Sequence, residues 1–329
     1  MRALALVLFA ACSYEPRANQ QPGDGTQGDG PPQTDAPETD APPDAFVGPP
    51  PSACVTKWLA ATPPLFSIPV FVERVGNVSI NNGLDERDPF ISSDGLQIYF
   101  SRVDGSNEDI LTASRAQVGD PFSVVAVKTS LTDEGAIDSK VTMTGDDLIA
   151  FIATERGGGE GAADLWEARR TTAGSGAFDP MTQEHLAAIN DGNKQLDPYI
   201  SPDGLRLYLA AGNPQQIVRS SRATLEDNFS APQPVTQLNG TVGDADPVMT
   251  ADERVVLFTR RDAGGSTDLF YATRAERDQV FGEPQQVTFN SIDLDADPMI
   301  SGDGCTVYFS STRDAGTSDY DLFVTDMTP

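Results

Sequence analysis

Four aspartates of the chain recur in one short pattern, each directly before a proline, and a lysine takes their place in a fifth copy. These residues are Asp88, Lys140, Asp197, Asp246 and Asp297. Carboxylates gathered around one point can bind a metal cation or the basic group of a peptide. Alternatively, each aspartate accepts hydrogen bonds from nearby backbone amides and fixes the turn before its strand, while the proline sets φ. Recurrence in every copy favours this second role, since a function needed in each repeat is usually structural.

The pattern belongs to a longer internal repeat of four predicted strands. Each copy has an apolar stretch, a turn such as Asp203-Gly204, an alternating strand, a third strand such as "DLFYAT" from Asp268, and a fourth that begins "FxxPxxV", as at Phe229. Aspartate and glycine suit a tight hairpin turn. The turn aspartates are spaced by 52, 57, 49 and 51 residues, at Asp94, Asp146, Asp203, Asp252 and Asp303. Four short strands at this period predict the blades of a β-propeller.

The two ends of the repeat region predict how the ring closes. The last copy stops after its third strand, at "DLFVTDMTP", and the missing fourth strand is found at the other end of the domain, in "FSIPVFV" over 66–72. A strand from the N-terminal side of the domain would complete the last blade and close the propeller, so that no terminal blade is left with an unpaired edge. We therefore expect an all-β fold of five four-stranded antiparallel blades. Six blades, the alternative, would require a further copy.

The repeated pattern "DPxxSPDGxxxYFxS…DLF" resembles the PD40, or WD40-like, repeats of TolB-type periplasmic propeller proteins. The resemblance covers about residues 66–329. It implies that the first strand of each blade lines a central channel, so that Asp88, Lys140, Asp197, Asp246 and Asp297 ring one mouth of it. TolB-type proteins generally carry six blades behind a small α/β domain, and this chain has neither feature in its sequence.

The N-terminal part of the chain predicts where in the cell the protein is located. "MRALALVLFAAC" resembles a bacterial lipoprotein signal peptide over 1–12, with Cys12 as the lipidated residue. Residues 13–53 are rich in proline, glycine and acids and predict a disordered linker, leaving 54–329 for the propeller. We expect a lipid-anchored, extracytoplasmic protein of the cell envelope, on the periplasmic face or the cell surface, that contacts the membrane through its anchor only.

Charge and cysteine content narrow the partners further. The net charge is −27, which disfavours nucleic acid and is compatible with a cationic partner. The chain holds three cysteines and one histidine, too few for a zinc cluster. With Cys12 lipidated, Cys54 and Cys305 remain as one possible disulfide that would lock the ring closure.

No cofactor is predicted, although calcium stays open as an alternative. Carboxylates alternate in "DLDADP" over 293–298 and in "GDADP" over 243–247. Both segments lack the glycine and the terminal glutamate of an EF-hand loop. His185 stands in an irregular connection, without a serine elbow that would complete a hydrolase triad.

Two functions follow as hypotheses. The first is a non-enzymatic propeller that binds a protein, peptide or glycan at one face. The second is a carbohydrate-active hydrolase of the five-bladed type, which would use paired carboxylates at the channel mouth. An enzyme should bring carboxylates of different blades together in a pocket and perturb a pKa, whereas a scaffold should satisfy each acid locally.

Overall fold

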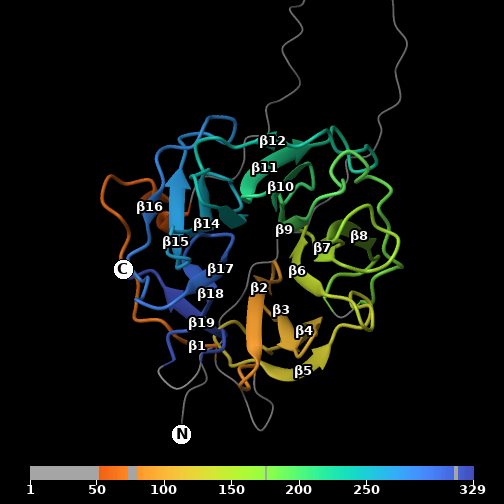
Figure 1. The fold of residues 1–329 in the computed structure, drawn as a ribbon. Coiled ribbons are helices and arrows are strands. Elements are labelled where there is room, and N and C mark those ends of the chain that lie inside the picture. The colour runs from red at the N-terminus through yellow and green to blue at the C-terminus, as the bar shows by residue number, and fades with distance from the viewer. Residues whose placement is uncertain (1–51, 73–79, 175, 315–317) are drawn as a thin grey trace, which may run out of the picture. The chain divides into compact units, whose positions relative to one another are not determined.

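Five antiparallel sheets surround a common axis in the computed structural model of this chain (Figure 1). The structure describes residues 52–72, 80–174, 176–314 and 318–329. The predicted signal peptide, Cys12 and nearly all of the predicted linker lie outside these residues. Among the residues described, no helix combines the length and the apolar composition that crossing a bilayer demands. The prediction of an all-β, five-bladed propeller is confirmed.

Each blade begins with an inner strand next to the axis and continues outward. The inner strands are β2 (Asp85–Ile91), β6 (Asp138–Met143), β9 (Gln195–Ile200), β13 (Asp244–Met249) and β17 (Asp295–Ile300). The second strands are β3 (Gln97–Asp104), β7 (Ile149–Thr154), β10 (Arg206–Ala211), β14 (Val255–Arg261) and β18 (Thr306–Ser311).

The outer half of each blade is less regular. The third strands are β4 (Asn107–Ser114), β8 (Asp164–Arg169), β11 (Gln216–Ser221), β15 (Thr267–Thr273) and β19 (Asp321–Asp326). The outermost strands are β5 (Ser123–Val127), β12 (Gln233–Pro234), β16 (Gln285–Gln286) and β1 (Val70–Phe71). The second blade has only three strands, and its outer position is taken by a bridge between Glu167 and Thr182.

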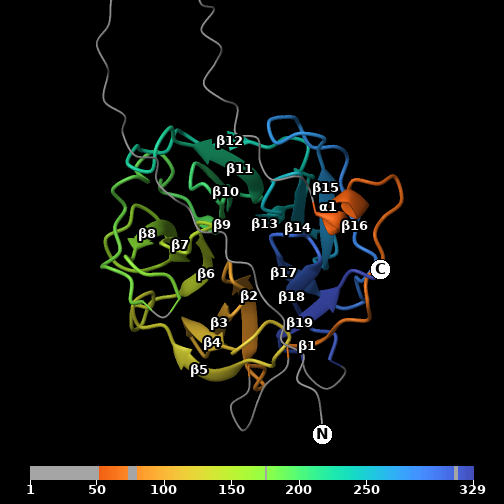
Figure 2. The same ribbon diagram turned by 180° about the vertical axis from the view of Figure 1, so that it is seen from behind.

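The predicted ring closure is confirmed. Strand β1 pairs with β19, with Val70 opposite Val324 and Phe71 opposite Phe323. Each inner strand also packs against the inner strands of both neighbouring blades, β17 against β2 included. Both views of the ribbon show orange β1 beside blue β19 (Figure 2). The first and last strands of the domain therefore share one sheet.

Asparagine side chains extend the third strands where the outermost strands are too short. Asn81, Asn190, Asn239 and Asn290 each donate from Nδ2 to the carbonyl oxygen of a third-strand residue. Each also accepts at Oδ1 from the amide of that same residue. The amide side chain thus satisfies a strand edge that would otherwise leave its backbone groups unpaired.

The hydrophobic core is distributed between adjacent sheets. In the gap between the second and third blades, Ile149 and Phe151 of β7 pack with Leu207 and Leu209 of β10, all nearly inaccessible to solvent. Alternating residues of a strand face the two neighbouring blades, which is why the second strand of each blade is buried over most of its length, as in β7 and β10. This rigid packing holds the inner strands in place around the axis.

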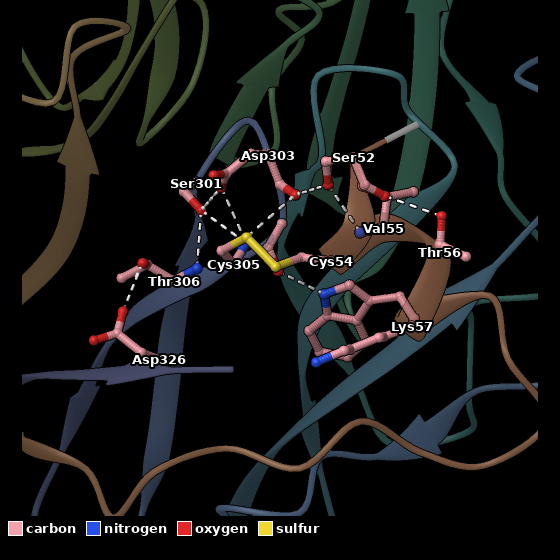
Figure 3. Close-up of a disulfide and its surroundings, with 12 residues drawn as sticks. Ser52, Cys54, Val55, Thr56, Lys57, Ser301, Asp303, Cys305, Thr306 and Asp326 are labelled. Atoms are coloured by element: carbon pink, nitrogen blue, oxygen red, sulfur yellow. Dashed lines mark hydrogen bonds between the residues drawn. A yellow bond between two sulfur atoms is a disulfide. The ribbon is translucent and has the colours of Figure 1, made fainter. Parts of the chain in front are cut away.

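The fifth blade carries an additional closure. Helix α1 (Ala53–Trp58) is capped by Ser52, whose hydroxyl donates to the carbonyl oxygen of Asp303. Cys54 of this helix forms a disulfide with Cys305, at the start of the second strand of the blade (Figure 3). The bond joins residues 251 positions apart and ties the N-terminal end of the domain to its last blade.

Trp58 of α1 occupies a position that an arginine holds in the other blades. In blades one to four, an arginine donates from Nε to the carbonyl of the turn between the first two strands and stacks on a phenylalanine: Arg115, Arg170, Arg222 and Arg274. In the fifth blade, Trp58 Nε1 donates to the carbonyl oxygen of Gly304 at 2.9 Å and packs against Phe66. The helix thereby completes the fifth blade.

Candidate functional site

A bulge in each inner strand turns one side chain toward the axis. Asp88, Lys140, Asp197, Asp246 and Asp297 all have positive φ, between 39° and 55°. The register of each inner strand against its neighbour shifts at this point. A bulge re-aims a side chain, and aspartate tolerates this left-handed conformation better than most residues.

The position of these residues in their strands corrects one expectation. The sequence predicted that the proline after each aspartate opens the strand. The strands instead begin two or three residues before the aspartate, as Asp85 precedes Asp88 in β2 and Asp244 precedes Asp246 in β13. The reason is that the aspartate lies within a bulge of the strand. The inner strand therefore pairs with the second strand both before and after the aspartate.

The five side chains converge, as the predicted ring requires. Lys140 Nζ lies 3.6 Å from Asp88 Oδ1 and 3.8 Å from Asp246 Oδ1. One carboxylate oxygen each of Asp88, Asp197 and Asp246 lies within 4.8 Å of the other two. We call Asp88, Lys140, Asp197, Asp246 and Asp297 the ring. It brings four carboxylates and one ammonium together from all five blades.

The ring forms the floor of a cavity at one mouth of the channel. This cavity has a volume of about 750 Å³ and is lined by all four ring aspartates. Below the ring, Pro89, Phe90, Tyr199 and Met299 leave a gap of only about 10 Å³. That gap holds a single water at most. A ligand that enters the larger cavity meets the carboxylates of the ring.

Burial and mutual repulsion perturb the ring electrostatically. Burial, together with the neighbouring carboxylates, raises the pKa values of Asp197 and Asp297 well above the usual range, and burial also raises the pKa of Asp88. Burial alone would lower the pKa of Lys140, but the carboxylates of Asp246 and Asp88 raise it. Lys140 thus keeps its proton, and the ring keeps an excess of acid groups.

The ring aspartates are not satisfied by local backbone, contrary to the structural role favoured by their recurrence. Asp88 accepts a hydrogen bond from the Ser101 hydroxyl at 3.3 Å. Within the described part of the chain, the carboxylates of Asp197, Asp246 and Asp297 accept no hydrogen bond. Their oxygens are therefore available to a ligand or a solvent molecule.

A second set of acids lies two residues before the ring and has a different environment. Glu86, Asp138, Asp244 and Asp295 are fully buried. Each pairs with an arginine that lies in the second strand of the same blade or two residues after its end. We call these the rim pairs. Asp244 and Asp295 belong to the two acidic segments that left calcium open. In each segment the acid two residues before the ring aspartate is bound to an arginine, Asp244 to Arg260 and Asp295 to Arg313.

The mouth of the cavity holds residues that sequence reasoning did not select. Burial, with the charge of Asp88, raises the pKa of Glu108 to about 7. The Arg87 guanidinium lies 4.2 Å from the centre of the Tyr320 ring, joining the first blade to the fifth. Arg87 directly precedes a ring aspartate. Glu108 and Tyr320 share another repeat position, directly before the aspartate that opens the third-strand motif, and this position could have marked them.

His185 lies elsewhere. Its ring Nδ1 is 3.2 Å from Glu167 Oε2, in the buried connection between the second and third blades. It does not line the cavity. His185 therefore lies apart from the ring.

Comparison with known proteins supports the fold. No protein-family model matches the chain, and no curated protein matches its sequence. Among solved structures, the catalytic domain of a GH62 α-L-arabinofuranosidase from Coprinopsis cinerea matches with a TM-score of 0.55 and 9% identity, over 81% of this chain and 98% of that one. The α-L-arabinofuranosidase PaAbf62A from Podospora anserina matches with a TM-score of 0.50 and 10% identity, over 79% and 97%.

TolB from Acinetobacter baumannii is also among the similar structures. It matches with a TM-score of 0.47 and 14% identity over 74% of this chain. This chain spans only 55% of the length of that TolB. The two arabinofuranosidase structures show a shared fold, and identities this low leave the function to be argued from the site.

Proposed function

We propose that the protein is a membrane-tethered, extracytoplasmic binding module, and that the cavity above the ring receives a positively charged part of a protein or peptide partner. The observation that carries this proposal is the ring itself, in which four carboxylates from four blades face one ammonium at the floor of an open cavity. Such an arrangement attracts cations and repels anions, and it raises the rate of association with a basic partner.

The walls of the cavity support the same reading. Six carboxylates line it, those of Asp88, Glu108, Glu155, Asp197, Asp246 and Asp297, against the three cations Arg87, Lys194 and Arg261. Two of these cations are already engaged, Arg87 with Asp85 and Lys194 with Glu155, at 2.9 Å in both pairs. The field at the mouth is therefore negative.

The test of binding is capture from the cell envelope of the source organism. We expect the full-length protein to retain a basic partner in a salt-sensitive manner, and the double variant Asp197→Asn/Asp297→Asn to lose it. Asp293→Asn removes a charge from an exposed loop on the same side and serves as the control. Retention of the same partner by the double variant would contradict the proposal.

The tether is a separate part of the proposal. The disulfide between Cys54 and Cys305 favours an oxidising, extracytoplasmic compartment. Cys12 and the linker over 13–53 would hold the propeller at a membrane surface. Incorporation of labelled fatty acid should depend on Cys12, and a Cys12→Ser variant should leave the membrane fraction. A variant that stays membrane-bound would remove the anchor from the proposal.

A glycoside hydrolase is the second candidate. In its favour, carboxylates of different blades converge in the cavity, Glu108 has a pKa of about 7, and the fold matches that of two α-L-arabinofuranosidases. Against an inverting mechanism, the nearest oxygens of three ring acids lie within 4.8 Å, whereas inverting pairs stand roughly 6.5–9.5 Å apart. Release of arabinose from arabinofuranosides, lost in Glu108→Gln, would establish this function. A preparation that releases no sugar would exclude arabinofuranosidase activity.

A further inference from the structure

The spacing of three ring oxygens is compatible with one ammonium group bound among them. Acceptors that each stand about 2.8 Å from one ammonium nitrogen are separated from each other by about 4.6–4.8 Å. One carboxylate oxygen from each of Asp88, Asp197 and Asp246 lies within 4.8 Å of the other two. One ammonium nitrogen can therefore donate to all three carboxylates at once.

Lys140 does not make these hydrogen bonds itself. Its Nζ is 3.6 Å from Asp88 and 3.8 Å from Asp246, beyond the distance of a charge-assisted hydrogen bond. The side chain is 2% exposed, and its ammonium has no hydrogen-bond partner among the described residues. A buried donor aimed at carboxylates without reaching them indicates that the ring is spaced for something more than Lys140 alone.

The charge balance agrees with an additional cation. Four carboxylates face the single ammonium of Lys140, and Asp197 and Asp297 are the two that keep partial solvent contact. A ligand that arrives through the cavity reaches these two first and the buried pair, Asp88 and Asp246, last. Its charge offsets the repulsion among the carboxylates that Lys140 leaves uncompensated.

We infer that Asp88, Asp197 and Asp246 form a receptor for one primary ammonium group, such as a lysine side chain or an amino terminus of the partner. This inference rests on the proposed function and narrows it. A guanidinium spreads its donors over a rigid plane, so carboxylates that surround it must stand farther apart. A trimethylated amine keeps the charge but has no N–H to donate.

The inference is tested by calorimetric titration of the full-length protein with Nα-acetyl-lysine methylamide, its arginine counterpart, its Nε-trimethyl form and calcium chloride. We expect the lysine probe to bind at least about tenfold more tightly than the arginine and trimethyl probes, because it alone makes three charge-assisted hydrogen bonds. Asp197→Asn should weaken the lysine probe by roughly tenfold or more. Asp293→Asn, with the same loss of charge, should leave its affinity unchanged.

The remaining outcomes separate this inference from the broader proposal. Equal affinity for the lysine and arginine probes, both lost in Asp197→Asn, overturns the ammonium receptor and leaves a general cation-binding module. Calcium that displaces the lysine probe overturns it in favour of a metal site. Absence of binding by all four probes, together with unchanged partner capture in Asp197→Asn/Asp297→Asn, overturns both.

Discussion

The acids of the ring and of the rim pairs stand two residues apart on the same inner strands, but they differ in their charged partners. Each rim acid has its own arginine, as Asp244 has Arg260 at 2.7 Å, and that arginine also donates to a carbonyl of the preceding loop. The ring acids share one lysine that does not reach hydrogen-bonding distance. Both sets recur in four blades. Recurrence thus does not separate a structural carboxylate from a binding one, whereas the partner of each carboxylate does.

The third blade shows that the rim position can do without charge. Gln195 stands where the other blades carry an acid, and it donates to Asp191 Oδ1 at 2.7 Å instead of binding an arginine. The same blade keeps its ring residue, Asp197. The two positions can therefore vary independently, which permits them to be tested one at a time.

The largest expected effect is the contrast between Asp295→Asn and Asp297→Asn. Asp295 is fully buried and bound to Arg313, so its replacement leaves a charge without its partner and should lower the free energy of unfolding by about 3–5 kcal/mol. Asp297 is repelled by its neighbours, so its replacement should leave stability within about 1 kcal/mol of the native value or increase it. Urea unfolding at pH 7.5 measures both, and equal losses would contradict the distinction between ring and rim.

Removing the disulfide tests how much this bond, which is formed at the fifth blade, stabilises the closed propeller. The double variant Cys54→Ser/Cys305→Ser should lose about 2–4 kcal/mol, since the bond restricts a very long loop in the unfolded chain. The native protein in reducing agent should reproduce the loss. Unchanged stability in both experiments would mean that the pairing of β1 with β19 suffices for closure.

The stability of the Lys140→Gln variant should depend on pH. Removing the ammonium leaves four carboxylates together and should cost about 2 kcal/mol at pH 8. Because the pKa values of Asp88, Asp197 and Asp297 are raised, the folded ring takes up protons before the unfolded chain does as the pH falls. The penalty should therefore shrink to below about 1 kcal/mol at pH 5.

Thermal unfolding of the native protein and of Lys140→Gln at the two pH values measures this difference. Lys194→Gln is the matched control, because Lys194 is an exposed cation at the same mouth and pairs with Glu155. Its effect should be small and nearly independent of pH. A Lys140→Gln penalty that grows on acidification would show that the ring is not acidic in excess.

The smallest expected effect concerns Trp58. Trp58→Phe keeps an aromatic ring against Phe66 and Tyr271 but removes the donor to the Gly304 carbonyl, which should cost about 1 kcal/mol. Chemical denaturation detects a change of this size, with Trp166→Phe, on the second blade, as the comparison. No loss in Trp58→Phe would indicate that packing alone, without the hydrogen bond, holds the helix.

The sequence contains further repeat positions besides the strands and turns. Asn81, Asn190, Asn239 and Asn290 each stand seven residues before a ring aspartate, a constant spacing that marks them as repeat residues. The arginines of the rim pairs stand at two alternative positions, 16 residues after the acid for Arg102 and Arg260 and 18 residues after it for Arg156 and Arg313. By contrast, Trp58 stands outside the repeat, and only the structure shows that it takes over the role of an arginine.

The sequence by itself determined the propeller, the number of blades and the closure by a strand from the N-terminal side, because strand periodicity and turn residues are local signals that recur at a fixed interval. It also placed Asp88, Lys140, Asp197, Asp246 and Asp297 at equivalent positions. Only the tertiary structure decided which acids face a ligand. In a regular strand, Asp295 and Asp297 would share one face. The bulge at Asp297 turns its side chain to the axis, whereas Asp295, in the regularly paired part of the strand, binds an arginine.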